Sequence, residues 1–250
     1  SDKTIATSYV LNAASHHGRI LILNESCAKE STGHGSPMPM LVHGGPGRAG
    51  GGEEMGGLRG VKHYLQRTAI QGSPDMISQI TQVHQYGSTG NEKEIHLFKK
   101  YFEELNIGDM LVTAKHTVTD ADITNFANLS GDHFYAHMDA TSLEGTIFNQ
   151  RVAHGYYILS KAAGLFVDAK KGPVLLNYGI DECRFTKPVY PGMTICVKLI
   201  VKEKIEQEKK SEDDIDKGIV KWLVDVFDES GDSVAIATIL TMVKKKYPSI

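Results

Sequence analysis

The segment HGYYILSKAAGLFVDA, from His154 to Ala169, decides the fold of this chain. Apolar side chains occupy nearly every side of its helical projection, and Ser160 and Lys161 are the polar interruptions in its middle. A helix that lies on a surface carries a polar stripe along its length, whereas a helix that is apolar nearly all round is buried. We therefore predict a helix that is wrapped by other elements.

Strand-like segments lie on both sides of this helix. Before it, MLVTAKHTVT (Met110 to Thr119) alternates as a strand does. The four that follow are rich in Val, Ile, Thr and aromatic residues: Leu175 to Phe185, Thr194 to Val201, Ile219 to Phe227 and Ser233 to Met242. One strand, then helices, then a run of strands predicts an α+β fold with an antiparallel sheet around a central helix. The charged segment Lys202 to Lys217 is interpreted as a solvated hairpin tip.

A second helix is predicted just upstream, beginning at a capping Thr119 and ending near Gly131. There the sequence SGDHFYAH, which starts at Ser130, sets Asp132 and His137 five residues apart. On a straight helix these two side chains would point roughly 140° apart, so they converge only if the backbone bends at the glycine. A carboxylate and an imidazole that reach one water molecule form a general acid and base pair. The alternative is a capped helix end whose polar side chains are satisfied locally.

His154 and Gly155 open the apolar helix. Backbone amides at a helix start can polarise a carbonyl oxygen, and a glycine lets a thioester approach the backbone closely. We therefore expect the Gly155 amide to hold the oxygen of a bound thioester, with His154 beside it among the substrate-binding residues. His154, taken alone, also fits a capping or core residue.

Two patterns resemble cofactor sites. His133 and His137 are spaced as a metal-binding pair, but Phe134 stands where a zinc hydrolase of that pattern keeps a glutamate. The sequence GPGRAG (Gly45 to Gly50) matches a nucleotide-binding loop, yet no carboxylate lies about 20 residues further on. We predict no metal site, and structural turns for the loop.

The composition of the chain limits its possible partners and its cellular location. Of 250 residues, 41% are hydrophobic and 23% charged, and the net charge is -3, so no basic field favours nucleic acid or an anionic membrane. No apolar run approaches the roughly 20 residues of a membrane-spanning helix. The first residues, SDKTIATSYV, lack the layout of a signal peptide, and the three cysteines share no metal-type spacing. We expect a cytoplasmic protein.

Glycine divides the chain into two units. Eleven of the 25 glycines fall between Gly33 and Gly60, and the polar passage QYGSTGNEKE (Gln85 to Glu94) has the composition of a linker. We place one unit over residues 1–90 and the other over residues 97–250.

The second unit resembles a known family over about residues 97–245. The sequences NFANLSGDHFYAH (Asn125 to His137), HG (His154 and Gly155) and RFTKPVYPGMTI (Arg184 to Ile195) are similar to the MaoC-type, (R)-specific enoyl-CoA hydratases. The resemblance implies the hotdog fold, in which a curved antiparallel sheet grips a long helix. It also implies an acyl-CoA thioester substrate and a homodimer or larger homo-oligomer.

The same resemblance implies roles for single residues. Asp132 and His137 match the catalytic pair that positions and deprotonates water, and Gly155 matches the amide that holds the oxyanion. The chain departs from the family where Asn, Pro and Leu are replaced by Phe134, Tyr135 and Ala136, and at Met193, where Asp is usual. We therefore expect a more aromatic pocket, with Phe134 and Tyr135 beside the substrate.

The first unit resembles the C-terminal end of an aldehyde dehydrogenase over Ile22 to Gly72. That arrangement is similar to the bifunctional ring-opening enzymes of aerobic phenylacetate degradation, whose hydratase half adds water to oxepin-CoA. In that family the nucleophilic cysteine, the glutamate base and the NADP-binding sheet lie upstream of this segment, so we expect no dehydrogenase activity, no cofactor in this chain and a structural Cys27. The alternatives are a general (R)-specific enoyl-CoA hydratase and a non-catalytic hotdog assembly module.

Overall fold

The computed structural model describes residues 2–14, 16–27, 68–209, 211 and 213–247. The chain divides into two compact units, Ser1–Thr89 and Gly90–Ile250. The predicted turns in the glycine-rich loop, Gly45 to Gly50, lie outside the described residues. Most of the segment that resembles an aldehyde dehydrogenase lies outside them as well.

The described part of the first unit is a small cluster of short elements, α1 (Lys3–Ala13), β1 (Arg19–Leu21), η1 (Glu25–Cys27), β2 (Ala69–Gln71) and α3 (Pro74–Thr81). Strands β1 and β2 pair in parallel. The side chains of Val10, Met76 and Ile80 form its buried core. Cys27 is buried, and its thiol donates to the carbonyl of Ile22, so it takes part in local packing.

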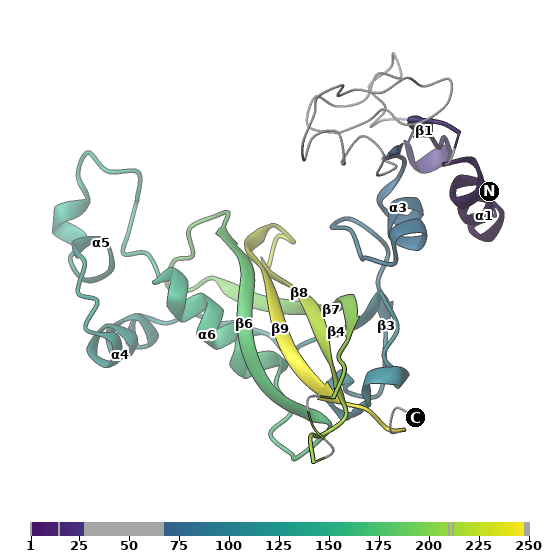
Figure 1. Ribbon diagram of the computed structural model, residues 1–250. Coiled ribbons are helices and arrows are strands. Elements are labelled where there is room, and N and C mark those ends of the chain that lie inside the picture. Colours follow the sequence, from purple (N-terminus) through teal and green to yellow (C-terminus); the bar gives the residue numbers. More distant parts are fainter. Residues whose placement is uncertain (1, 15, 28–67, 210, 212, 248–250) are drawn as a thin grey trace, which may run out of the picture. The chain divides into compact units, whose positions relative to one another are not determined.

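The second unit is built on a seven-stranded sheet in the order β3-β4-β7-β8-β9-β6, with β5 paired to β7. Strand β3 runs parallel to β4, and every other pairing is antiparallel. The strands are β3 (Asn91–Glu92), β4 (Asp109–Val112), β5 (His116–Thr117), β6 (Val174–Phe185), β7 (Thr194–Glu206), β8 (Lys217–Asp228) and β9 (Ser233–Lys244). Figure 1 shows the long strands β6, β8 and β9 curving beside helix α6.

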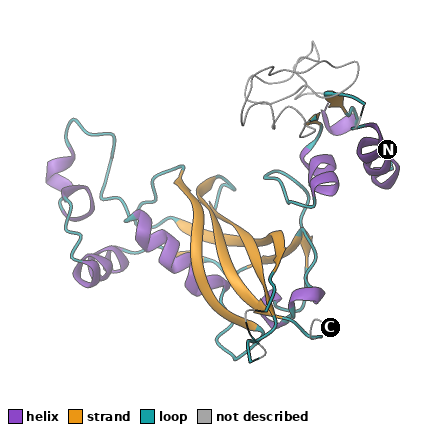
Figure 2. Cartoon of the chain, in the orientation of Figure 1, coloured by secondary structure: helices purple, strands orange, loops and turns teal. Residues whose placement is uncertain are grey.

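The helical elements of this unit are η3 (Leu97–Lys99), η4 (Phe102–Glu104), α4 (Asp120–Ser130), α5 (Tyr135–Met138), η5 (Ala140–Leu143) and α6 (Gly155–Phe166). Helix α6 packs its Tyr157, Ile158, Ala162 and Phe166 into the same core as the Val, Ile and Trp222 side chains of the sheet. Helices α4 and α5 lie outside the curved sheet (Figure 2). The four long strands confirm the predicted α+β architecture.

Three details of the sequence prediction are wrong. Helix α6 is covered on one side only, because the sheet grips a single face and leaves Tyr156 71% exposed. The single strand predicted over residues 110–119 is two, because the register with β7 shifts by one residue between Val112, which faces Lys198, and His116, which faces Ile195. The hairpin tip is shorter than residues 202–217, because β7 continues to Glu206 with the Lys204 side chain lying over the ring of Phe102.

Candidate active site

The end of helix α4 sets the position of Asp132. The helix begins with a capping box, in which Thr119 and Asp122 each accept a hydrogen bond from the other's backbone amide. It ends at Gly131, whose φ of 79° is in the left-handed region that favours glycine. The Asp132 carboxylate then accepts a bond from the amide of Phe134 at 3.2 Å, and α5 begins one residue later. The bend predicted at Gly131 is therefore present.

Because of this bend, three side chains come together. One polar side-chain atom of each of Asp132, His137 and His154 lies within 4.8 Å of the others. We call these three residues the acid–histidine cluster. Asp132 is exposed, His137 is half-buried and His154 is buried. The structure thus brings the predicted acid and base together, and it adds a second imidazole to them.

Hydrogen bonds fix which nitrogen of each imidazole carries a proton. Nδ1 of His137 lies 2.6 Å from the carbonyl oxygen of Val152, and Nε2 of His154 lies 2.9 Å from that of Asp132. A carbonyl only accepts, so both of these nitrogens are donors. Nε2 of His137 is left as its basic atom. The two rings stack with centroids 3.8 Å apart and planes 29° apart.

The surroundings of the cluster favour a neutral His154. Burial lowers the pKa of its imidazole, the bond to the Asp132 carbonyl opposes this, and a charge on the neighbouring His137 would lower the pKa further. A neutral His154 therefore adds no positive charge to the cluster.

Gly155 follows the cluster as the first residue of α6. Its amide is one of the first-turn N–H groups for which a helix offers no internal acceptor, so it is available to a ligand oxygen. A Cβ atom at this position would lie 2.6 Å from Cε2 of Phe185, closer than carbon atoms approach. The packing of this ring against the backbone therefore explains why the position is glycine.

Phe134 and Tyr135 lie beside the cluster without enclosing it. Their ring centroids are 4.5 Å apart, and the Phe134 ring contacts His137 at 5.9 Å. Phe134 is 53% exposed and Tyr135 41%. These two rings stand at the start of a short helix outside the sheet, so they lie beside His137 and remain open to solvent.

The geometry of the cluster does not suit a metal ion. A metal lies in the plane of each imidazole that binds it, along the nitrogen lone pair, whereas the rings of His137 and His154 are stacked. The nitrogens that are not bonded to a carbonyl, Nε2 of His137 and Nδ1 of His154, would have to turn toward a common point to bind one ion. His133, the other half of the predicted metal-like pair, is exposed and stands outside the cluster.

A polar network behind the cluster was missed by the sequence analysis. The hydroxyl of Tyr157, on α6, lies 3.1 Å from Nε2 of His116, which is 3.4 Å from the Asp122 carboxylate. Burial and the neighbouring Asp122 raise the pKa of Tyr157 above its usual range. Phe126 contacts both Tyr157 and His154 and so joins this network to the cluster. Tyr157 lies more than 30 residues beyond His116, Asp122 and Phe126, so no local pattern joins it to them.

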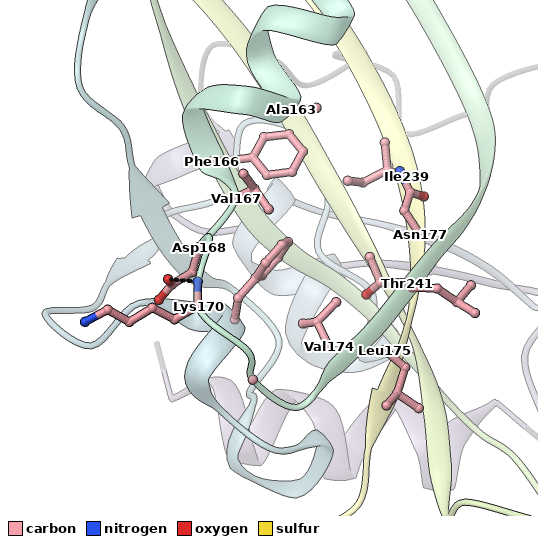
Figure 3. Close-up of a pocket in the computed structure, with 13 residues that line it drawn as sticks. Ala163, Phe166, Val167, Asp168, Lys170, Val174, Leu175, Asn177, Ile239 and Thr241 are labelled. Atoms are coloured by element: carbon pink, nitrogen blue, oxygen red, sulfur yellow. Dashed lines mark hydrogen bonds between the residues drawn. The ribbon is translucent and has the colours of Figure 1, made fainter.

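The cavity of Figure 3 lies at the opposite end of α6 from Gly155. Its volume is about 270 Å³, and its walls include Phe166 of α6, Ile239 of β9 and Phe98. Phe166 is eleven residues beyond Gly155, which is about 16 Å along a helix axis. The cavity is therefore separate from the acid–histidine cluster.

Within the described residues, no helix is both long and apolar enough to span a membrane.

Comparison with known proteins supports the assignment of the fold. Residues 104–222 match the family model of the MaoC like domain. Over 210 residues, 84% of its length, the chain is 59% identical to Protein MaoC of Klebsiella aerogenes and spans 63% of that protein. It is 29% identical over 113 residues to an (R)-specific enoyl-CoA hydratase of Rhodospirillum rubrum, a match that covers 45% of this chain and 77% of the relative.

Among solved structures, Rv0216 of Mycobacterium tuberculosis, described as a double hotdog fold, superposes with a TM-score of 0.54. The match covers 62% of this chain and 48% of that one at 14% identity, and so it concerns the fold alone. Residues 104–222 are therefore similar to the MaoC like domain family, and the second unit has a hotdog fold.

Proposed function

We propose that this chain catalyses the reversible addition of water to the carbon–carbon double bond of an enoyl-CoA thioester. The observation that carries the proposal is the acid–histidine cluster, in which an exposed carboxylate and a half-buried imidazole meet beside the first amide of a helix. The relatives that match include an (R)-specific enoyl-CoA hydratase and a 3-hydroxybutyryl-CoA dehydratase, which supports the same reaction class.

The proposed reaction assigns one task to each group. The water molecule lies between the Asp132 carboxylate and Nε2 of His137; one of these groups removes a proton as the water oxygen attacks the β-carbon. The electron pair of the double bond moves toward the thioester, whose oxygen becomes negative and accepts a bond from the Gly155 amide. The other group delivers a proton to the α-carbon. The reverse sequence is dehydration.

We propose oxepin-CoA as the physiological substrate, with a straight-chain enoyl-CoA as the alternative. Attack of water on the conjugated carbon bonded to the ring oxygen gives a hemiacetal, and its collapse opens the ring to an aldehyde. The exposed rings of Phe134 and Tyr135 support a cyclic substrate, because they offer flat apolar surface next to His137. We propose that the chain itself does not oxidise the aldehyde.

Two substrates distinguish a ring-opening enzyme from a general enoyl-CoA hydratase. Purified protein is mixed with crotonyl-CoA or with oxepin-CoA, and the loss of the conjugated thioester absorbance is followed. A ring-opening enzyme turns over oxepin-CoA with the higher kcat/KM, whereas a general hydratase prefers crotonyl-CoA. Turnover of neither substrate would favour the non-catalytic assembly module and contradict the proposed function.

We also propose that the domain assembles as a homodimer or a larger homo-oligomer. Strand β6 is a twelve-residue edge strand whose exposed side chains include Leu176, Tyr178 and Ile180. An uncovered edge of this length with apolar side chains promotes association. Analytical ultracentrifugation tests the proposal: a monomer at micromolar concentration would contradict it.

A further inference from the structure

His154 occupies a position that does not suit contact with a substrate. Its side chain is 1% exposed, and although it stands at the N-cap of α6, it makes no capping bond to the helix. Instead its Nε2–H is donated to the carbonyl oxygen of Asp132, 22 residues away in sequence. The interactions of this side chain are therefore with the acid–histidine cluster.

The hydrogen bond restrains the backbone that carries the acid. Asp132 follows the left-handed Gly131 and has an exposed side chain, so burial does not hold its carboxylate in place. A bond from a buried donor to the Asp132 carbonyl limits the motion of that residue toward solvent. The direction of the carboxylate is then set by His154 together with the bond from the Phe134 amide.

The ring of His154 also restrains the base. His137 is bonded at Nδ1 to Val152 and is stacked on His154, so two residues of one short segment fix both its tautomer and its plane. Phe126 contacts the His154 ring at 5.1 Å and limits the space into which that ring could turn. Among the described residues, Nδ1 of His154 is buried and has no hydrogen-bond partner. The hydrogen bond that this imidazole makes is therefore the one from Nε2 to the Asp132 carbonyl.

We propose that His154 is a positioning residue that fixes Asp132 and His137 relative to each other, through one hydrogen bond and one stacked ring. The inference rests on the proposed hydration reaction and deepens it. It gives His154 a role other than the expected substrate contact, because a side chain this buried acts through its neighbours.

Four variants test this role. H154F keeps an aromatic ring against His137 and removes the donor to Asp132. H154Q places an amide N–H near the position of Nε2, whereas the shorter H154N reaches only the position of Nδ1. H133Q changes an exposed histidine outside the cluster and serves as the matched control.

The expected result is a separation of activity from stability. H154F should keep the melting temperature of the parent protein or exceed it, because the buried nitrogen without a partner is removed. Its kcat for crotonyl-CoA hydration should fall on the order of 10- to 100-fold with little change in KM, as for a misplaced catalytic group. H154Q should recover more of kcat than H154N, and H133Q should match the parent.

An independent measurement needs no substrate. In the free protein, the imidazole ¹⁵N resonances of His137 report its tautomer and its surroundings. In H154F, and not in H133Q, these resonances should shift, and so should the pH dependence of kcat.

The inference is overturned if H154F keeps kcat within about twofold of the parent value and leaves the His137 resonances and the pH profile unchanged. A change in kcat of about twofold or less is what a residue with a purely structural role would give. If D132N and H137Q also keep full activity, the proposed function fails as well, and the two failures are thereby distinguished.

Discussion

The substitution G155A tests the amide at the start of α6. A Cβ atom there would meet three atoms of the Phe185 ring at 2.6, 2.7 and 2.9 Å, whereas ordinary contacts begin at 3.4 Å. Relief of the overlap requires a movement of about 0.8 Å by the ring or the helix start. If the helix start moves, its amide leaves the position of the thioester oxygen, and a displacement near 1 Å costs about 100-fold in rate.

The size of the effect depends on which partner moves. Phe185 is 49% exposed, so its ring can take up part of the movement. We therefore expect kcat/KM for crotonyl-CoA to fall on the order of 10- to 100-fold, or about 1.4 to 2.8 kcal/mol of transition-state stabilisation.

A double-mutant cycle shows whether the loss comes from the overlap. F185A removes the ring atoms that a Cβ would meet, so G155A/F185A should recover at least half of the loss in free energy relative to F185A alone. Steady-state kinetics of the four proteins, with circular dichroism to check folding, provide the test. Parent activity in G155A, or no recovery in the double variant, would refute the assigned role of this amide.

Three further outcomes concern stability. Burial lowers the pKa of His154 below its unfolded value of about 6.5, so below pH 6.5 the unfolded chain binds more protons than the folded one. The melting temperature should therefore be highest above pH 6.5 and fall as the pH decreases. This fall should be less steep in H154F. W222F removes the buried bond from the indole to Thr241 Oγ1, 2.8 Å long, and should lower the free energy of unfolding by about 1 to 3 kcal/mol in urea titrations. G218A places a Cβ against the ring of Phe102, which is 2% exposed and cannot yield, and should destabilise by about 1 to 3 kcal/mol while leaving the kcat of folded protein unchanged.

Three of the four long strands, β6, β8 and β9, begin and end within two residues of the predicted bounds, whereas β7 continues five residues beyond its predicted end. Strand β9, for example, was expected from Ser233 to Met242 and runs from Ser233 to Lys244. Its alternation and β-branched residues are local signals. The prediction for the region of β4 and β5 is wrong because the break between them is a shift of register against β7, a distant strand, which no local pattern reports.

The candidate site also has features that local sequence signals predict and features that they do not. The bend at Gly131 and the meeting of Asp132 with His137 follow from a glycine at a helix end, which is a local signal. The bond from His154 to the Asp132 carbonyl joins residues 22 apart, and it could not be predicted before the position of α4 relative to α6 was known. The exposure of Phe134 has the same cause, because it depends on where α5 stands relative to the sheet.

The central claim is that Asp132 and His137 act on one water molecule. The most direct test is the single-turnover hydration of crotonyl-CoA by the parent protein, D132N and H137Q, each present in excess over the thioester. A carboxamide cannot accept a proton, so D132N should lose on the order of 100- to 10,000-fold in rate, and H137Q a comparable amount, while both retain the parent's circular dichroism spectrum. Hydration by folded D132N at the parent rate would contradict the account.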